Sequence, residues 1–272
     1  MRPETFKSEE KRMRMKKMIF LVMVLVWIPS TVWGGIVTKT ISYEHGGKQL
    51  EGYLAWDDAV AGRRPGVLVV HEWWGLNDFA RKQAEKLAAL GYNAFALDMY
   101  GKGKVTAHPE EASEWSKKVT GNIESWRKRA LAGLEVLRKD RRTDKNRIAA
   151  VGYCFGGSTV QQLAYAGADV LGVVSFHGSL VAPPEDVTGG DTAKILICHG
   201  ASDPMTKKSS IPGYISAMEK SGIDWQLVMY GGAVHSFTNP GADAAGMDGV
   251  AYSESADRRS WQHMQVFFDE LF

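Results

Sequence analysis

The sequence contains little cysteine, almost no net charge and no histidine pattern typical of a metal site. Only 2 of its 272 residues are cysteine, which excludes the class of small disulfide-stabilised domains. The formal charge of +2 gives no reason to expect a nucleic-acid partner. None of the spacings among the 7 histidines suggests metal ligation, so no metal or cofactor is expected. With 44% hydrophobic and 24% charged residues, the composition is ordinary for a soluble globular protein with a sizeable core.

The N-terminal segment has the three-part layout of a secretory signal peptide. Residues 11–17 are basic, residues 18–28 are apolar, and residues 29–35 offer small side chains near a cleavage site. The apolar stretch is too short for a comfortable membrane helix, which needs about 20 residues. We expect cleavage after Gly34 and a periplasmic or secreted protein. The weak fit to the cleavage pattern leaves an uncleaved membrane anchor as the alternative, and translation could also start at Met13.

Removal of residues 1–34 changes the charge balance. That segment holds seven Lys or Arg and three Glu, so the charge falls from +2 to −2. The rest, residues 35–272, shows no repeat, low-complexity tract or linker, and we predict one domain. We expect a small-molecule substrate and no nucleic acid as partners, no stable membrane association once the signal is cleaved, and a monomer.

The pattern of residues 35–272 predicts an α/β fold. Alternating residues 36–43 and 50–56 around His45-Gly46-Gly47-Lys48 predict an N-terminal β-hairpin. Buried strands are then expected at residues 66–70, 93–97, 147–151, 170–176, 194–200 and 224–230. Helices are expected at residues 79–90, 109–119, 123–139, 209–220 and 255–272, and after the strand at 147–151. Strands separated by helices predict a mainly parallel, twisted sheet with helices on both faces.

The stretch VGYCFGG, residues 151–157, places Cys154 between Gly152 and Gly156. With a strand before it and a helix after it, this is the layout of a nucleophile elbow, with cysteine in place of serine. The alternative is a small buried core residue. Cys198 lies in a buried-strand pattern two strands further along. The two cysteine-bearing strands would be almost 10 Å apart, beyond the roughly 7 Å between Cα atoms that a disulfide allows, so we expect two free thiols.

An acid and a base follow the elbow in the order nucleophile, acid, histidine. Asp203 comes directly after one strand and His235 directly after the next, and ligands of open α/β sheets bind at this edge. Asp203 could instead cap a turn, and His235 could be an exposed loop residue. His177 and His199 end strands near the same edge, and their roles stay open.

Glu72 lies in VVHEWWGLN, at the end of the strand whose following loop supplies part of the oxyanion hole in such folds. Next to two tryptophans its carboxylate would be partly desolvated, which raises its pKa and suits it to accept a proton. An exposed loop glutamate is the alternative.

With these four segments in view, the chain resembles the dienelactone hydrolase family over about residues 36–272. The motifs GYCFGG, HEWWGLN, ASDP and AVHSF carry the resemblance. It implies an α/β-hydrolase fold with a triad of Cys154, Asp203 and His235, and a carboxymethylenebutenolidase-like activity on lactones and other esters without metal or cofactor. It also implies that Glu72 accepts the thiol proton when substrate binds, so the resting cysteine is largely protonated.

We therefore expect Cys154 to attack an ester carbonyl, assisted by Glu72 or His235, and to form a thioester acyl-enzyme. Backbone N–H groups of Trp73 and Phe155 would hold the oxyanion. His235, oriented by Asp203, would protonate the leaving alkoxide and then activate water.

The substrate pocket is predicted less sharply. Dienelactone-cleaving members of the family carry an arginine four positions beyond the histidine, where this chain has Asn239, which cannot form a bidentate pair with a carboxylate. A neutral or aromatic ester is therefore at least as well suited as an anionic dienelactone. The aromatic candidates for the pocket rim, each of which could equally be packing, are Trp73, Trp74, Tyr100, Trp115 and Phe237.

Two other functions compete with ester hydrolysis. A thiol redox sensor or peroxide-reducing protein would use Cys154 at a helix N-terminus, which lowers a thiol pKa, but no resolving cysteine lies nearby in the sequence. A non-catalytic binding protein could also use a hydrolase fold, although all four chemical positions are filled.

Overall fold

Residues 35–272, the part of the chain that this computed structural model describes, begin with the predicted β-hairpin. Strand β1 (Ile36–His45) pairs antiparallel with β2 (Lys48–Asp57) from Ile36 opposite Asp57 to His45 opposite Lys48. The two turn residues, Gly46 and Gly47, have φ of 58° and 71°, a conformation that tight hairpin turns require and glycine adopts without strain. The predicted export signal and its cleavage after Gly34 lie outside the described residues.

The other six strands form a parallel array that continues from the hairpin. They are β3 (Arg64–Val70), β4 (Asn93–Leu97), β5 (Thr143–Tyr153), β6 (Gly172–Phe176), β7 (Lys194–Gly200) and β8 (Trp225–Tyr230). The sheet order is β1-β2-β4-β3-β5-β6-β7-β8. β2 pairs antiparallel with β4, and every later pair is parallel. The carboxyl ends of β3, β5, β7 and β8 therefore share one edge.

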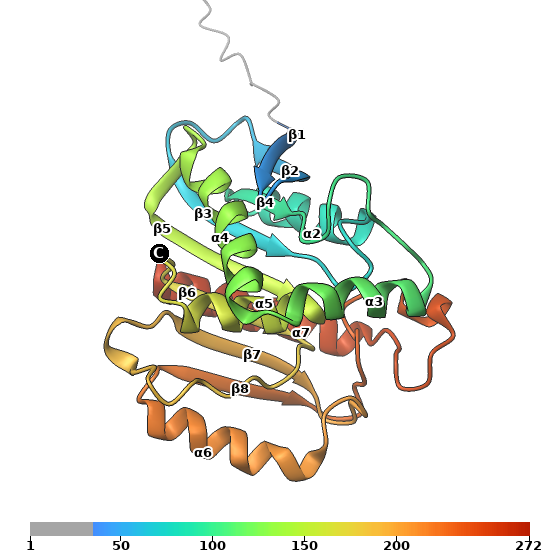
Figure 1. Ribbon diagram of the computed structural model, residues 1–272. Helices are drawn as coiled ribbons and strands as arrows, with labels where there is room; N and C mark the ends of the chain where they lie inside the picture. Colours follow the sequence, from blue (N-terminus) through green and yellow to red (C-terminus); the bar gives the residue numbers. More distant parts are fainter. Residues whose placement is uncertain (1–34) are drawn as a thin grey trace, which may run out of the picture. The chain divides into compact units, whose positions relative to one another are not determined.

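Helices cover both faces of this sheet (Figure 1). α2 (Asp78–Ala89) and α7 (Glu254–Leu271) pack on one face, and α4 (Ile123–Lys139), α5 (Phe155–Tyr165) and α6 (Ile211–Ser221) on the other, while α3 (Pro109–Thr120) packs against α4. Three short 3₁₀ turns, η1 (Gly189–Asp191), η2 (Lys208–Ser210) and η3 (Ala242–Ala245), lie in loops. The predicted α/β-hydrolase arrangement, a mainly parallel sheet covered on both faces, is confirmed.

Alternation along the central strands divides the interior into two cores. In β3, Leu68 and Val70 join the core beneath α4 and α5, while Val67 and Val69 join the core beneath α2 and α7. All four are fully buried, as expected for a strand with helices on both of its faces.

The two cysteines are free, as predicted. Cys198 is fully buried in β7, and β6 separates that strand from β5, which leads into Cys154. Among residues 35–272, no helix combines the length and apolar character that crossing a membrane requires.

Candidate active site

The turn between β5 and α5 holds Cys154 in a strained backbone conformation. Its φ of 54° and ψ of −115° are unusual for a residue with a Cβ. The flanking glycines are required by space, because a Cβ at Gly152 would collide with the carbonyl of Gly156, and one at Gly156 with the carbonyl of Val70 in β3. The two glycines thus allow the turn to pack directly against the neighbouring strand, and Cys154 lies at the edge of the sheet.

Cys154, His235 and Asp203 form one hydrogen-bonded chain. Sγ of Cys154 lies 3.0 Å from Nε2 of His235, and Nδ1 of His235 lies 2.8 Å from Oδ2 of Asp203. The backbone N–H of Met205 donates to the other oxygen of Asp203 at 2.8 Å, which fixes the carboxylate. The loops after β7 and β8 thus bring both predicted partners to the cysteine, and both side chains are buried rather than exposed.

The charges of Cys154 and Asp203 determine whether the His235 imidazole is protonated. Burial alone would lower the pKa of His235, but the attraction of Cys154 and Asp203 outweighs it and raises that pKa to about 10. Burial alone would raise the pKa of Asp203, yet the hydrogen bond and charge of His235 hold it below its ordinary value. The imidazole is therefore a stable resting place for a proton between sulfur and carboxylate.

Glu72 is almost completely buried, at 1% exposure, so the exposed-loop alternative is wrong. Its two oxygens accept hydrogen bonds from Oγ of Ser236 at 2.8 Å and Nδ2 of Asn239 at 2.7 Å. Burial raises the pKa of Glu72, while these bonds and the charge of His235 oppose the rise. No hydrogen bond joins Glu72 to Cys154 in the described part of the chain; Glu72 instead anchors the loop that carries His235.

His177, whose role the sequence leaves open, braces the elbow from the adjacent strand. It is fully buried with φ of 41°. Its Nδ1 accepts from the backbone N–H of Cys154 at 3.2 Å, and its Nε2 lies 2.7 Å from Oγ1 of Thr238. Burial holds the pKa of His177 well below its usual value, so the ring is neutral and donates from Nε2 to the threonine. Sequence reasoning missed Thr238 and Ser236 altogether; their only signal was proximity to His235.

The two residues whose backbone N–H groups are expected to hold an oxyanion line the cavity that contains Cys154. Phe155 opens helix α5 and Trp73 lies in the turn after β3. Neither N–H has an acceptor among residues 35–272, and both residues line the same cavity as Cys154. Both N–H groups are therefore without a partner in residues that share a cavity with Cys154.

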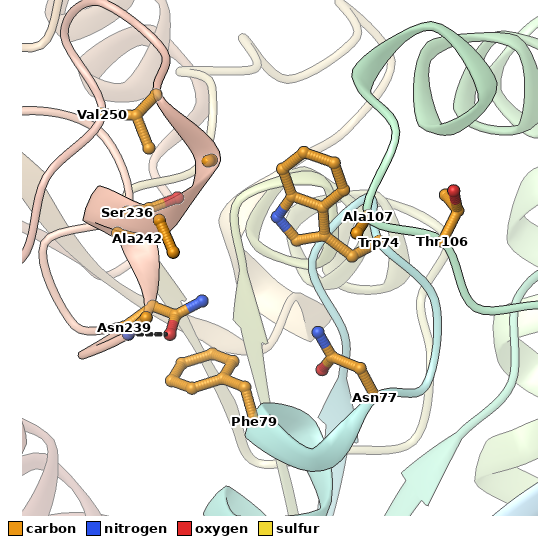
Figure 2. Close-up of a pocket in the computed structure, with 12 residues that line it drawn as sticks. Trp74, Asn77, Phe79, Thr106, Ala107, Ser236, Asn239, Ala242 and Val250 are labelled. Atoms are coloured by element: carbon orange, nitrogen blue, oxygen red, sulfur yellow. Dashed lines mark hydrogen bonds between the residues drawn. The ribbon is translucent and has the colours of Figure 1, made fainter.

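Adjoining cavities surround the cysteine. One of about 340 Å³ is lined by Cys154, His235, apolar side chains that include Trp73, Trp126 and Met205, and polar ones that include Lys117. A smaller one, of about 90 Å³, lies between these residues and Trp74. Beyond Trp74 is a third, of about 260 Å³. Figure 2 shows the Trp74 indole and the Asn239 amide at its walls.

Only some of the predicted pocket residues line the cavities near Cys154. Trp74 and Asn239 line the cavity in Figure 2, but the Asn239 amide is already bonded to Glu72, and its oxygen accepts from the N–H of Gly241 at 2.9 Å. Tyr100 and Trp115 line a separate cavity. The prediction for Phe237 is wrong, because its fully buried ring packs against Tyr230 and His177 in the core.

His199 ends β7 beside this site. It is buried at 1% exposure, and its Nδ1 has no hydrogen-bond partner within residues 35–272. Burial lowers its pKa. In the same described range, no group of three or more His, Cys, Asp or Glu side chains is placed to hold a metal ion.

Comparison with known proteins gives a consistent set of relatives. The model of the Dienelactone hydrolase family matches residues 50–272. The chain is similar to a solved dienelactone hydrolase-like promiscuous phosphotriesterase from metagenomic libraries, with a TM-score of 0.84, 37% identity and coverage of 88% of this chain and 100% of that one. It is also similar to the solved structure m3DLH, with a TM-score of 0.84, 41% identity and the same coverage. A Saccharolobus solfataricus protein, provisionally named a carboxymethylenebutenolidase, is 25% identical over 84% of this chain and 97% of its own length.

Proposed function

Because the chain belongs to the dienelactone hydrolase family, and is thereby a hydrolase of esters or lactones, we propose that it works through Cys154 and a thioester acyl-enzyme. The observation that carries this proposal is the chain of short contacts from Sγ of Cys154 through His235 to Asp203, 3.0 and 2.8 Å. A nucleophile bonded to a base, with the base oriented by a carboxylate, is the arrangement that acyl transfer requires.

In the first half of the reaction, the thiol proton already resides on Nε2 of His235, because the pKa of this imidazole is raised to about 10, and the thiolate sulfur of Cys154 attacks the carbonyl carbon. The tetrahedral oxyanion accepts hydrogen bonds from the backbone N–H groups of Trp73 and Phe155, and losing one such donor typically costs about 100- to 1000-fold in rate. Collapse breaks the ester C–O bond. The departing alkoxide takes the proton from His235, leaving the acyl group on sulfur.

In the second half, water attacks the thioester and gives a proton to His235. The C–S bond breaks, the carboxylic acid leaves, and the sulfur and imidazole return to their starting state. Asp203 holds the imidazole with Nε2 facing the reacting atoms throughout. Glu72 acts as a positioning residue, since both of its oxygens already hold the loop of His235. Accepting the thiol proton would require it to give up one of these bonds.

The walls of the main cavity favour an uncharged substrate. Trp73, Trp126, Val181 and Met205 line it, and the one lysine in its lining, Lys117, is solvent-exposed. Asn239 offers no cation at the position where dienelactone-cleaving members carry an arginine. We therefore propose neutral or aromatic carboxylic esters and lactones in preference to anionic dienelactones. A panel of p-nitrophenyl esters and small lactones tests this preference, and it should include a phosphotriester because one relative is a promiscuous phosphotriesterase.

Replacement of each cysteine in turn tests the nucleophile. Cys154→Ala should reduce ester turnover to background while the protein stays folded, and Cys154→Ser should retain little activity because a hydroxyl is far less acidic than a thiol. Cys198→Ala is the matched control. It leaves the site intact, and its lost core packing should cost about 1 kcal/mol or less of stability. The measurement is turnover of p-nitrophenyl acetate, with circular dichroism as the check on folding.

Peptide mapping of the trapped acyl-enzyme completes the test. The acyl mass should appear on the peptide that contains Cys154. An acyl group on a serine, or wild-type turnover in Cys154→Ala, would overturn the proposal. Stoichiometric peroxide consumption by Cys154 without ester turnover would favour the redox alternative instead.

A further inference from the structure

A separate cavity of about 150 Å³ lies between the β-hairpin, the loop after β4, and helices α3 and α4. Four cationic side chains line it, and none of its lining residues is acidic. The cations are Lys48, Lys104, Lys118 and Arg129. They come from four segments of the chain, so the fold gathers them.

None of these four cations forms a salt bridge within residues 35–272. Their neighbour Lys102, by contrast, pairs with Glu51 at 3.0 Å. Asp98 is the acid whose charge reaches Lys48, but its carboxylate accepts from the N–H groups of Glu51, Tyr100 and Gly101 at 3.2, 2.8 and 2.8 Å. Asp98 therefore offsets part of the positive charge without pairing, and no carboxylate within residues 35–272 forms a direct ion pair with any of the four cations.

The cations are close enough to repel one another. The pKa of Lys48 is lowered by burial and further by the charges of Arg129, Lys104 and Lys118. Lys104 relieves part of this by placing Nζ 4.8 Å from the centre of the Trp115 ring. An arrangement of like charges that costs stability in the empty protein is stabilised when an anion enters it.

Two buried donors in the same wall have no acceptor. Tyr100 is 2% exposed and its hydroxyl has no partner among the described residues; Nε of Arg129 is likewise buried and without one. The guanidinium is held in place because another of its nitrogens donates to the carbonyl of Met99 at 3.0 Å. The Tyr100 ring is fixed between His71, Trp115 and Phe155. Buried donors normally have partners, and both residues line the cavity.

We propose that this cavity is a binding site for a small oxyanion of the phosphate type, either free phosphate or the phosphate of a monoester. Four cations, one of which (Arg129) has an unpartnered Nε, together with the Tyr100 hydroxyl match the several oxygens and double charge of such a group. The size of the cavity suits one tetrahedral group. The site is distinct from the proposed ester-cleaving site, because Tyr100 and Phe155 stand between them with ring centres 5.6 Å apart.

Titration of the full chain with inorganic phosphate at constant ionic strength tests the site, followed by ³¹P NMR and calorimetry. We expect one saturable site with a Kd at or below about 1 mM. Lys118→Gln and Tyr100→Phe should each weaken binding about tenfold, the effect of losing a hydrogen bond to a charged group. Lys102→Gln, whose lysine pairs with Glu51 instead of lining the cavity, is the matched control and should bind as the wild type does.

Further ligands identify the source of the anion. Equal affinity for glycerol phosphate and phosphate would show that the cavity takes the head of a monoester, and binding of phosphate alone would show that it takes the free ion. Three results would overturn the proposal. They are no saturable phosphate binding, binding that Lys118→Gln and Tyr100→Phe leave unchanged, and binding of citrate in preference to phosphate.

Discussion

Three non-glycine residues within residues 35–272 have positive φ, and all three surround one imidazole. Cys154, His177 and Ser236 have φ of 54°, 41° and 56°. Cys154 contacts His235 through sulfur, Ser236 follows it in the chain, and the ring of His177 lies 5.5 Å from its ring. Such conformations cost about 1–3 kcal/mol each and persist only where the surroundings enforce them. Strain is thus concentrated at the proposed catalytic centre.

The two neighbouring histidines are expected to carry different charges at neutral pH. The pKa of His235 is raised to about 10, whereas burial holds that of His177 well below its usual value. NMR titration of the imidazole carbon-bound protons should show His235 losing its proton only near pH 10 and His177 neutral throughout. Cys154→Ala removes one attraction and should lower the pKa of His235. Titration of His235 near pH 6.5 in the wild type would contradict the assigned ion pairing.

The same shift has a defined effect on stability. Because the pKa of His235 is higher in the folded than in the unfolded chain, where it is about 6.5, its protonation favours the folded state. That stabilisation is fully present below about pH 6.5 and is lost as the pH rises through about 10. Chemical denaturation of the wild type and of His235→Gln across this range should show a difference that declines with rising pH.

The sequence predicts the residues of the site better than their contacts. The order of Cys154, Asp203 and His235 follows from three strand ends, so spacing alone indicates it. The hydrogen bond between Glu72 and Asn239 joins residues 167 positions apart in the sequence. The hydrogen bond between His177 and Thr238 joins residues 61 positions apart. Such hydrogen bonds depend on which strands become neighbours and on the directions of the side chains. A local sequence pattern contains neither kind of information.

Among the elements, strands with uninterrupted apolar runs are predicted best. The predicted strands at residues 93–97 and 194–200 match β4 and β7. Strand β5 begins four residues earlier than predicted, at Thr143, because a polar and charged segment pairs with Arg64 and Pro65 at the rim, where no hydrophobic signal marks it. The prediction that Phe237 lies at the pocket rim is wrong for the opposite reason, because a glycine-rich loop suggests exposure whereas this one folds back into the core.

Glu72 anchors the loop after β8, and the substitution Glu72→Gln distinguishes this positioning role from a role in proton transfer. Glutamine keeps an oxygen for Asn239, and its amide can donate to the Ser236 hydroxyl, which also accepts. We therefore expect Glu72→Gln to retain acylation and deacylation rates within about tenfold of the wild type, while Glu72→Ala loses about 100-fold or more in both because a buried network is broken. Burst kinetics with p-nitrophenyl acetate measures the two rates.

The pattern across variants decides between the two roles of Glu72. Asn239→Ala removes one of the same hydrogen bonds, so its effect should not add to that of Glu72→Ala. Acylation that collapses in Glu72→Gln while deacylation stays normal would instead establish the carboxylate as the acceptor of the thiol proton.

At the scale of the whole molecule, the site is a property of the completed sheet. Its groups follow β3, β5, β7 and β8, which form two neighbouring pairs on either side of β6 in the sheet. The hydrogen bond between Ser236 and Glu72 joins residues 164 positions apart, and the contact between His235 and Cys154 spans 81.

Because the site residues are far apart in the sequence, recovery of enzyme activity reports when the last step of folding is complete. Parallel pairing between distant segments forms slowly, because the entropy of closing long loops is lost before the contacts form. During refolding from denaturant, helical circular dichroism should therefore recover first. Ester turnover should return only when β8 docks beside β7 and delivers His235 to Cys154. Simultaneous recovery of both signals would show instead that the sheet and its reactive edge form in a single step.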